Sequence, residues 1–352
     1  MMRAAKIRVL VVDDSPTVRA SLCGILASEP DIEVVGDAED GARGMELCER
    51  LRPDVITLDM AMPRVDGLAV TEHVMAHCPR PILIVSASHE RGEAFSTFDA
   101  LKAGAVDVLE KATGNEPEGE WERQFIATVK LVARIKVITR PRARPKACGP
   151  SPMSAGLAKT AVSRYSAVAI GASTGGPSAV VQVLRALPPQ FPIPVLLVLH
   201  IGAGFAPAFA EWLSGQTPHK IAFPRGGERL AELGGGVIMA PADRHVVVHD
   251  GMLFFSDEAE RHSCRPSVDV LFESVAASCG ASAVGCLLTG MGRDGAAGLR
   301  LIRQAGGRTI VQDEATSVVY GMPREAVLLG AAERVLPLNE IGPALASLAE
   351  VG

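Results

Sequence analysis

Short apolar runs alternate with longer amphipathic segments through the first part of the chain. The segments 16–27 and 41–50 have the spacing of helices that cover one face of a sheet. The apolar runs between such segments are residues 7–12, 32–36, 54–58, 81–85 and 105–109. Strands that alternate with helices at this spacing predict βαβ units and a parallel sheet. We therefore expect a doubly wound domain of five βα units over residues 5–135.

The stretch of residues 139–156 has a different character. It is rich in Pro, Arg, Lys, Gly and Ser, and it lacks apolar periodicity. This composition predicts an exposed linker, which we place at residues 136–160. Binding of an anion by its basic residues is the alternative interpretation.

The alternation resumes near residue 166. Five further apolar runs cover residues 167–170, 194–199, 236–240, 283–288 and 308–312. Between two other strand-like runs, Asp250-Gly251 is a strong signal for a hairpin turn. Residues 161–350 are therefore expected to form a second doubly wound, parallel α/β domain that carries a β-hairpin.

Composition and charge narrow the class of protein. The 352 residues are 48% hydrophobic and 21% charged, and the net charge of −5 argues against a nucleic-acid partner. The seven cysteines are scattered without CxxC spacing, so neither a zinc site nor a disulfide framework is predicted. The first residues predict no secretory signal, and no apolar run reaches the ~18 residues that span a bilayer. We expect a cytoplasmic protein that is not inserted in a membrane.

Several polar residues of the first domain follow predicted strands directly. Because ligands of open parallel sheets bind at the carboxyl ends of the strands, these side chains should share one pocket. Three carboxylates together suit Mg²⁺, and one of them could then act as a nucleophile toward a phosphoryl group. Taken singly, such an aspartate is more often a helix cap. The residues are Asp13, Asp14, Asp59, Ser86 and Lys111.

The segments VLVVDDSPTVR and VITLDMAMPRVDGL, with the late Lys111, resemble the receiver domain of response regulators, which has the flavodoxin-like (βα)5 fold. The resemblance implies that Asp59 accepts a phosphoryl group from a histidine kinase. It implies that Asp13 and Asp14, with Asp59, bind Mg²⁺, and that Ser86 and Lys111 contact the phosphoryl group.

Two positions depart from the receiver pattern. Val108 stands where receivers usually carry an aromatic switch residue, and Ala112 follows the lysine where proline is usual. These departures count against the usual aromatic signalling route. Phosphorylation of the domain is still expected.

The second domain contains a G-x-S-x-G sequence at a predicted strand-to-helix turn. Such a turn exposes the hydroxyl of Ser173 at the edge of the sheet. His200 ends another strand and Asp294 follows a third, so the three side chains satisfy the placement that a Ser-His-Asp triad requires. Singly, Ser173 could be a helix cap and His200 a structural histidine.

A competing pattern overlaps Asp294. Gly290, Gly292 and Gly295 form a literal GxGxxG after a strand, and Asp313 stands about 20 residues further on, which is the dinucleotide fingerprint. Because that fingerprint normally opens the first βαβ unit of a domain, its late position here makes nucleotide binding the less favoured interpretation.

The segments GASTGGP, LHIGAGF, RPSVDVLF, LTGMGRDGA and VQDEATSVVYGMP resemble the chemotaxis protein-glutamate methylesterases, which also deamidate glutamine. The resemblance implies that Ser173 is the nucleophile, His200 the general base and acid, and Asp294 the carboxylate that orients His200. Thr174 and the Met291 backbone would support the oxyanion.

The same resemblance implies the partners and the control of the enzyme. Methyl-accepting chemoreceptors would be the substrate, ester hydrolysis would need no cofactor, and the chain would be a monomer. The unphosphorylated receiver would restrain the esterase. Arg293 departs from the family pattern, and its charge could weaken the hold of Asp294 on His200 or simply point to solvent.

Two other functions remain as alternatives. The second domain could bind a nucleotide or a partner protein through its glycine-rich loops without catalysis, under control of phosphorylation. A DNA-binding response regulator is disfavoured, because such outputs are usually smaller, basic, helical modules.

Overall fold

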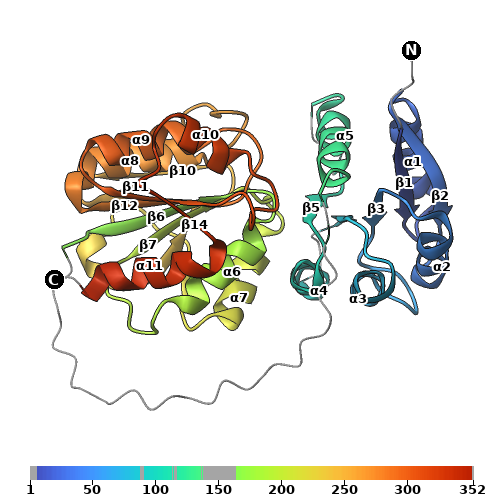
Figure 1. Ribbon diagram of the computed structural model, residues 1–352, viewed down its shortest axis with the longest axis horizontal. Helices are drawn as coiled ribbons and strands as arrows, with labels where there is room; N and C mark the ends of the chain where they lie inside the picture. Colours follow the sequence, from blue (N-terminus) through green and yellow to red (C-terminus); the bar gives the residue numbers. More distant parts are fainter. Residues whose placement is uncertain are drawn as a thin grey trace. The chain divides into compact units, whose positions relative to one another are not determined.

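The computed structural model describes residues 6–87, 91–112, 114, 117–135, 137 and 164–350. The chain divides into two units, Met1–Leu157 and Ala158–Gly352, and each is described by itself (Figure 1). Nearly all of the predicted linker lies outside the described residues. The proposed domain limits of 5–135 and 161–350 stay predictions.

The first unit is a five-stranded parallel sheet with the strand order β2-β1-β3-β4-β5. This order is that of the flavodoxin-like fold. Helices α1 and α5 lie on one face, and α2, α3 and α4 lie on the other (Figure 1). In chain order the elements are β1 (Ile7–Val12), α1 (Pro16–Ala27), β2 (Ile32–Ala38), α2 (Gly41–Leu51), β3 (Val55–Leu58), α3 (Gly67–His77), β4 (Ile82–Ser86), α4 (Arg91–Ala103), β5 (Asp107–Glu110) and α5 (Glu120–Val132).

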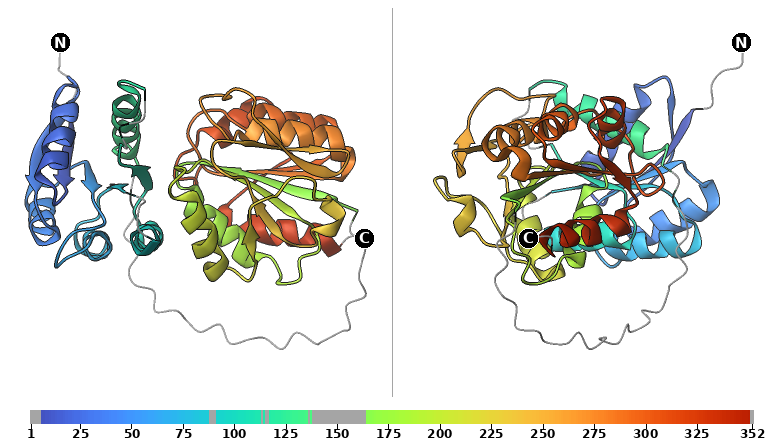
Figure 2. Two further views of the ribbon diagram at one scale, coloured as in Figure 1. Left: turned by 180° about the vertical axis from the view of Figure 1, so that it is seen from behind. Right: turned by 60° about the vertical axis from the view of Figure 1, so that its left-hand side comes forward.

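The second unit is a seven-stranded parallel sheet with the order β14-β13-β12-β6-β7-β9-β8, and a separate antiparallel hairpin, β10–β11. Helices α8, α9 and α10 cover one face, and α6, α7 and α11 cover the other (Figure 2). The strands are β6 (Ala167–Ala172), β7 (Val195–Leu199), β8 (Ile221–Ala222), β9 (Val237–Met239), β10 (His245–His249), β11 (Met252–Ser256), β12 (Ala283–Leu287), β13 (Arg308–Gln312) and β14 (Arg334–Leu336). The helices are α6 (Gly176–Ala186), α7 (Ala206–Gln216), α8 (Val268–Cys279), α9 (Ala296–Gln304), α10 (Met322–Leu328) and α11 (Leu338–Glu350).

The predicted fold class is confirmed, and a strand forms at each of the ten predicted apolar runs. The hairpin is also confirmed: Asp250 and Gly251 have φ angles of 48° and 72°, as a two-residue turn with both residues left-handed requires. The short strands β8 and β14 were not predicted. They form the two edges of the sheet, where two or three residues give too weak a pattern to detect.

No helix among the described residues is long and apolar enough to cross a membrane.

The core of the second unit includes Phe272, a residue of α8 that is fully buried against the sheet. We expect Phe272→Ala to lower the free energy of unfolding by about 3–5 kcal/mol, because it removes a large side chain from a closely packed interior. Urea denaturation followed by circular dichroism measures this. Phe254→Ala is the matched control, since Phe254 is 39% exposed and its loss should cost no more than about 0.5 kcal/mol. Equal destabilisation by the two changes would contradict the described core.

Candidate active site and acidic pocket

Ser173 and His200 follow adjacent strands of the second sheet. Strands β6 and β7 are paired in parallel with Ala172 opposite Leu199, and the N–H of His200 donates to the carbonyl of Ala172 at 3.1 Å. Neighbouring strands lie about 4.8 Å apart, so Ser173 and His200, which directly follow these two strands, have adjacent backbones. The sheet therefore brings the predicted serine and histidine together.

The turn that carries Ser173 is held by backbone contacts. The Ser173 N–H donates to the Thr289 carbonyl at 3.0 Å, and Gly175 has a φ of +74°, which favours glycine. A Cβ atom at Gly290 would lie only 2.8 Å from the Cβ of Ser173. The loop after β12 thus packs directly over the turn of the predicted nucleophile, and this contact requires its first glycine.

His200 and Asp294 form a direct pair. The His200 Nε2 atom lies 3.0 Å from Asp294 Oδ2, and the Asp294 side chain is almost fully buried. Three further donors to this carboxylate come from the start of α8: the Ser267 hydroxyl at 2.7 Å, the Val268 N–H at 2.7 Å and the Asp269 N–H at 3.0 Å. The Gly295 N–H donates to it as well, at 3.0 Å. The first turn of a helix is a favourable place for a negative charge, so α8 both holds and stabilises the Asp294 carboxylate.

Val268 also fixes the surrounding backbone through its side chain. A Cβ atom at Gly171 would lie 2.2 Å from Val268 Cγ1, and one at Gly295 would lie 2.5 Å from the same atom. The side chain of Val268 therefore occupies the space beside both the strand that leads to Ser173 and the residue that follows Asp294.

The pKa values of this pair move apart. Burial opposes ionisation of Asp294, but the hydrogen bond and charge of His200, with the donors of α8, hold the pKa of Asp294 below its usual value. Burial likewise disfavours charged His200, yet the hydrogen bonds with Asp294 and Cys264 raise the pKa of His200 to about 9. Asp294 and Cys264 thus stabilise the charged form of His200 that arises when the neutral imidazole accepts a proton.

The second ring nitrogen of His200 is the one left for chemistry. Its Nδ1 atom lies 3.6 Å from the Sγ atom of Cys264, and no hydrogen bond joins His200 to Ser173. Catalytic hydrogen bonds are often long in enzymes without substrate. The pairing of β6 with β7, which brings the backbones of Ser173 and His200 side by side, is therefore the evidence that the two side chains can interact. Cys264 was not predicted, because 64 residues separate it from His200 and it belongs to no recognisable cysteine spacing.

Arg293 does not contact Asp294. Its Nε atom donates to His262 Nδ1 at 3.2 Å, while His262 Nε2 lies 3.0 Å from Asp269 Oδ2. The guanidinium is thus engaged by an exposed histidine, and a direct competition with His200 for Asp294 is not seen. His245, which lies in the hairpin, accepts from the Ser267 N–H and has a structural role.

Thr174 and Met291 flank the serine turn. The Thr174 carbonyl accepts from the Thr289 hydroxyl at 2.9 Å, and the Met291 side chain is 51% exposed. Within the described residues, the backbone N–H groups of Thr174 and Met291 donate to no protein acceptor. Both donors are therefore available to a ligand at this edge of the sheet.

The glycines of the GxGxxG segment have a structural explanation. Gly290 packs on Ser173, and Gly295 has a φ of +85° beside Val268. Asp313, the acidic residue of the fingerprint, accepts from the N–H and hydroxyl of Thr316. These contacts account for the pattern without a dinucleotide.

The acidic residues of the first unit also meet at the carboxyl edge of their sheet. Lys111 Nζ lies 2.9 Å from Asp13 Oδ2 and 3.0 Å from Asp59 Oδ2, and both carboxylates are buried. The Ser86 hydroxyl is 3.3 Å from Asp59 Oδ1 and also bonds to Glu93. All the predicted members of this pocket therefore lie together, and Asp14 is the partly exposed one among its three aspartates.

The charges of this pocket are coupled. Burial raises the pKa of Asp13, and the hydrogen bond and charge of Lys111 offset only part of that rise. The pKa of Lys111 is raised because the charges of Asp59 and Asp13 outweigh its own burial. Ligand oxygens of Asp13, Asp14 and Asp59 lie within 4.8 Å of one another, so this all-oxygen donor set fits a hard divalent cation.

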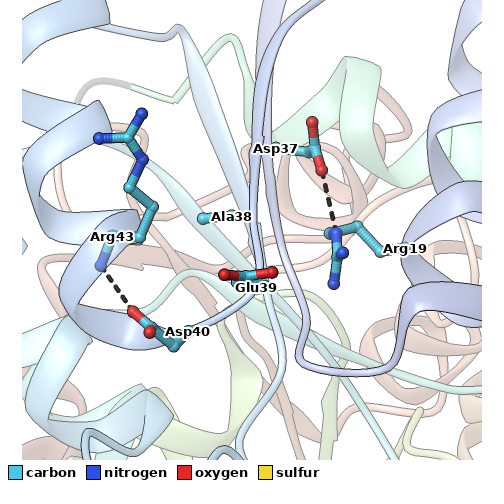
Figure 3. Close-up of a pocket in the computed structure, with 6 residues that line it drawn as sticks. All are labelled: Arg19, Asp37, Ala38, Glu39, Asp40 and Arg43. Carbon is cyan, nitrogen blue, oxygen red and sulfur yellow. Dashed lines mark hydrogen bonds and ion pairs between the residues drawn. The ribbon is translucent and has the colours of Figure 1, made fainter.

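A separate hollow lies beside the carboxyl end of β2 (Figure 3). Its charges are largely paired: Arg19 bonds to Asp37 at 2.9 Å, Arg64 bonds to Asp40 at 2.9 Å, and Arg43 bonds to Glu46. Figure 3 shows the Arg19–Asp37 pair on one side of the hollow and, on the other, the helix-cap bond from the backbone N–H of Arg43 to Asp40. Its lining therefore offers few groups for chemistry.

These two sites define a class of protein before any comparison is made. One unit carries the acidic pocket of a receiver, and the other carries a serine, a histidine and a buried carboxylate on an α/β sheet. The model of the CheB methylesterase family matches residues 168–345, and that of the response regulator receiver domain matches residues 9–117. The chain belongs to the CheB methylesterase family.

Relatives match along nearly the whole chain. A protein-glutamate methylesterase/protein-glutamine glutaminase of Anaeromyxobacter dehalogenans is 43% identical and covers 97% of each chain. One from Geobacter metallireducens is 44% identical over 97% of this chain and 99% of its own. Among solved structures, the catalytic domain of Thermotoga maritima CheB methylesterase is 33% identical over 52% of this chain and 97% of its own, with a TM-score of 0.49.

We expect NMR titration of the His200 imidazole in the full chain to give a pKa of about 9. Asp294→Asn should lower that pKa, because the imidazolium loses its partner charge. Cys264→Ala should lower it as well, since the thiol contributes to the rise. A His200 pKa at or below the ordinary 6.5 in the unaltered protein would contradict the pairing.

Proposed function

We propose that this chain hydrolyses glutamyl methyl esters on methyl-accepting chemoreceptors, and deamidates glutamine side chains, through Ser173, His200 and Asp294. The observation that carries this proposal is the buried His200–Asp294 pair beside the Ser173 turn. The names of the relatives support the two activities.

The proton transfer follows from which ring nitrogen is occupied. Because Nε2–H donates to the buried Asp294 carboxylate, Nδ1 is the atom that takes the proton of Ser173. The Ser173 oxygen attacks the ester carbonyl, and the proton passes from Nδ1 to the departing methanol. Water, activated by the same nitrogen, then hydrolyses the acyl-enzyme to glutamate and free serine. With glutamine as substrate, ammonia leaves in place of methanol.

The tetrahedral intermediate needs donors for its oxygen. The N–H groups of Thr174 and Met291 are the proposed oxyanion donors, because they flank the serine and have no other protein partner among the described residues. Such a donor is worth about 10²- to 10³-fold in rate. Asp294 orients the imidazole and stabilises its charged form.

Phosphorylation of the receiver is proposed to occur on Asp59, with a histidine kinase as donor. Asp13, Asp14 and Asp59 would hold Mg²⁺, which neutralises charge as the phosphoryl group arrives. Lys111 contacts Asp59, and Ser86 lies 3.3 Å from the same carboxylate, which supports the proposal that both bind the phosphoryl oxygens. We propose that this modification relieves a restraint on the esterase.

A cytoplasmic monomer is the proposed form of the enzyme. The cysteines at the described positions are free thiols, as a reducing compartment favours.

Ser173→Ala should lower methanol release from methylated receptor by roughly 10³-fold or more, because the nucleophile is lost. The thermal unfolding midpoint should stay within a few degrees of the unaltered protein. Ser347→Ala is the control, since that hydroxyl only bonds within α11. A Ser173→Ala enzyme with a near-normal rate would disprove the mechanism.

Asp59→Asn should abolish phosphoryl incorporation from a small-molecule phosphodonor with Mg²⁺. In the full chain it should also remove any rise in methanol release that the donor causes. Asp66→Asn is the matched control: this exposed helix cap accepts from Ala69 N–H and lies outside the acidic pocket. Donor stimulation that survives in Asp59→Asn would refute the assignment of the modified residue.

A further inference from the structure

Cys264 lies at the nitrogen on which the proposed mechanism depends. Its Sγ atom is 3.6 Å from His200 Nδ1, and the residue is only partly buried, so solutes can reach it. No catalytic step derived above uses this thiol.

A tight turn holds Cys264 in place. Arg261 and Cys264 exchange two backbone hydrogen bonds of 3.1 and 3.0 Å, and His262 and Ser263 between them both have positive φ angles. The Arg261 guanidinium also binds both carboxylate oxygens of Glu273, at 2.5 and 2.6 Å. This bidentate pair fastens the turn to α8, the helix that holds Asp294, so thiol and imidazole share one rigid support.

The distance between the two atoms suits a bridging metal ion. Zinc binds imidazole nitrogen at about 2.0 Å and thiolate sulfur at about 2.3 Å, and at a tetrahedral angle these bonds place nitrogen and sulfur ~3.5 Å apart. The observed 3.6 Å needs almost no movement of either side chain.

His200 also has the hydrogen-bond partner that is typical of a metal-binding histidine. Histidines that bind metals usually donate their other ring N–H to a carboxylate, which fixes the tautomer and strengthens the ligand. Asp294 has this relation to His200. Asp294 also belongs to a second group of potential ligands, with His262 and Asp269, but both ring nitrogens of His262 are already engaged there, by Arg293 and Asp269.

We propose that His200 Nδ1 and Cys264 Sγ form a binding site for a soft divalent metal ion of the zinc class, which inhibits the esterase. Water fills the remaining positions on the ion, and on binding the thiol proton, with the Nδ1 proton of any charged imidazole, is released to solvent. Inhibition follows because the metal occupies the lone pair that would take the Ser173 proton. That consequence rests on the proposed role of His200, whereas metal binding itself does not.

The first experiment measures methanol release by the full chain as Zn²⁺ is raised, with excess Mg²⁺ present to occupy the oxygen ligands of the receiver. Each variant is compared with its own zinc-free rate. We expect inhibition that a chelator reverses, and at least about tenfold weaker inhibition in Cys264→Ala and Cys264→Ser. Cys78→Ser is the matched control: it removes the thiol that lies 3.2 Å from Cys48 in the receiver, and its zinc sensitivity should not change.

The second experiment detects the metal without any enzyme assay. Co²⁺ replaces Zn²⁺ in the Cys78→Ser chain, and the thiolate-to-cobalt absorption band is recorded. The band should form there and be lost in Cys78→Ser/Cys264→Ala, while circular dichroism confirms that both chains are folded.

The outcomes separate this proposal from the proposed function. Loss of the band with Cys264 supports the metal site even if the chain releases no methanol, which would count against the esterase alone. A band that persists without Cys264, or zinc inhibition that is equal in Cys264→Ala and the unaltered chain, would overturn the metal site.

Discussion

The buried carboxylate of Asp294 is the constraint on which the catalytic unit depends. A charge with almost no access to water persists only if donors replace its hydration, and here the first turn of α8 and His200 supply them. The contact with Asp294 occupies Nε2 of His200 and therefore leaves Nδ1 as the nitrogen available for the proposed proton transfer. It also sets the high pKa of His200, at about 9. Packing, charge and proton transfer are thus consequences of a single buried group.

Both units solve the problem of assembling a site in the same way. A parallel sheet brings residues from distant parts of the chain to one edge, and the candidate site residues lie at the ends of strands or in the loops that follow them. In the first unit this principle places Asp59 and Lys111 within ion-pair distance, and in the second it places Ser173 beside His200. The two sites differ in the partner of their carboxylates: Lys111 in the first unit and the His200 imidazole in the second.

Much of this organisation was predictable from sequence because it depends on local patterns. Apolar runs identified the strands, and the order of strands and helices placed Asp13, Asp59, Lys111, Ser173, His200 and Asp294 at sheet edges. The partners of Asp294 on α8 were not predicted, although Ser267 before an apolar helix is a typical N-cap signal. Cys264 could not be found, because only the turn between β11 and α8 brings it to His200.

The edge strands β8 and β14 were not predicted because local sequence patterns cannot identify such short strands. Strands β8 and β14 form because a neighbouring strand offers free hydrogen-bonding groups, and their own few residues carry no detectable periodicity. The conflict between the dinucleotide fingerprint and the triad was likewise a matter of three-dimensional contacts. The proximity of Gly290 to Ser173, and the positive φ of Gly295 beside Val268, explain why that loop needs these glycines.

Val268 has a consequence for how this protein can change over evolutionary time. Its N–H donates to the Asp294 carboxylate, and its methyl groups fill the space that glycine leaves at positions 171 and 295. A mutation to a bulkier residue at any of these three positions would displace the backbone on both sides of the reaction centre. Positions 171 and 268 should therefore drift only together, with a gain of volume at one compensated by a loss at the other, whereas Gly295, with a φ of +85°, stays glycine whatever space is freed beside it.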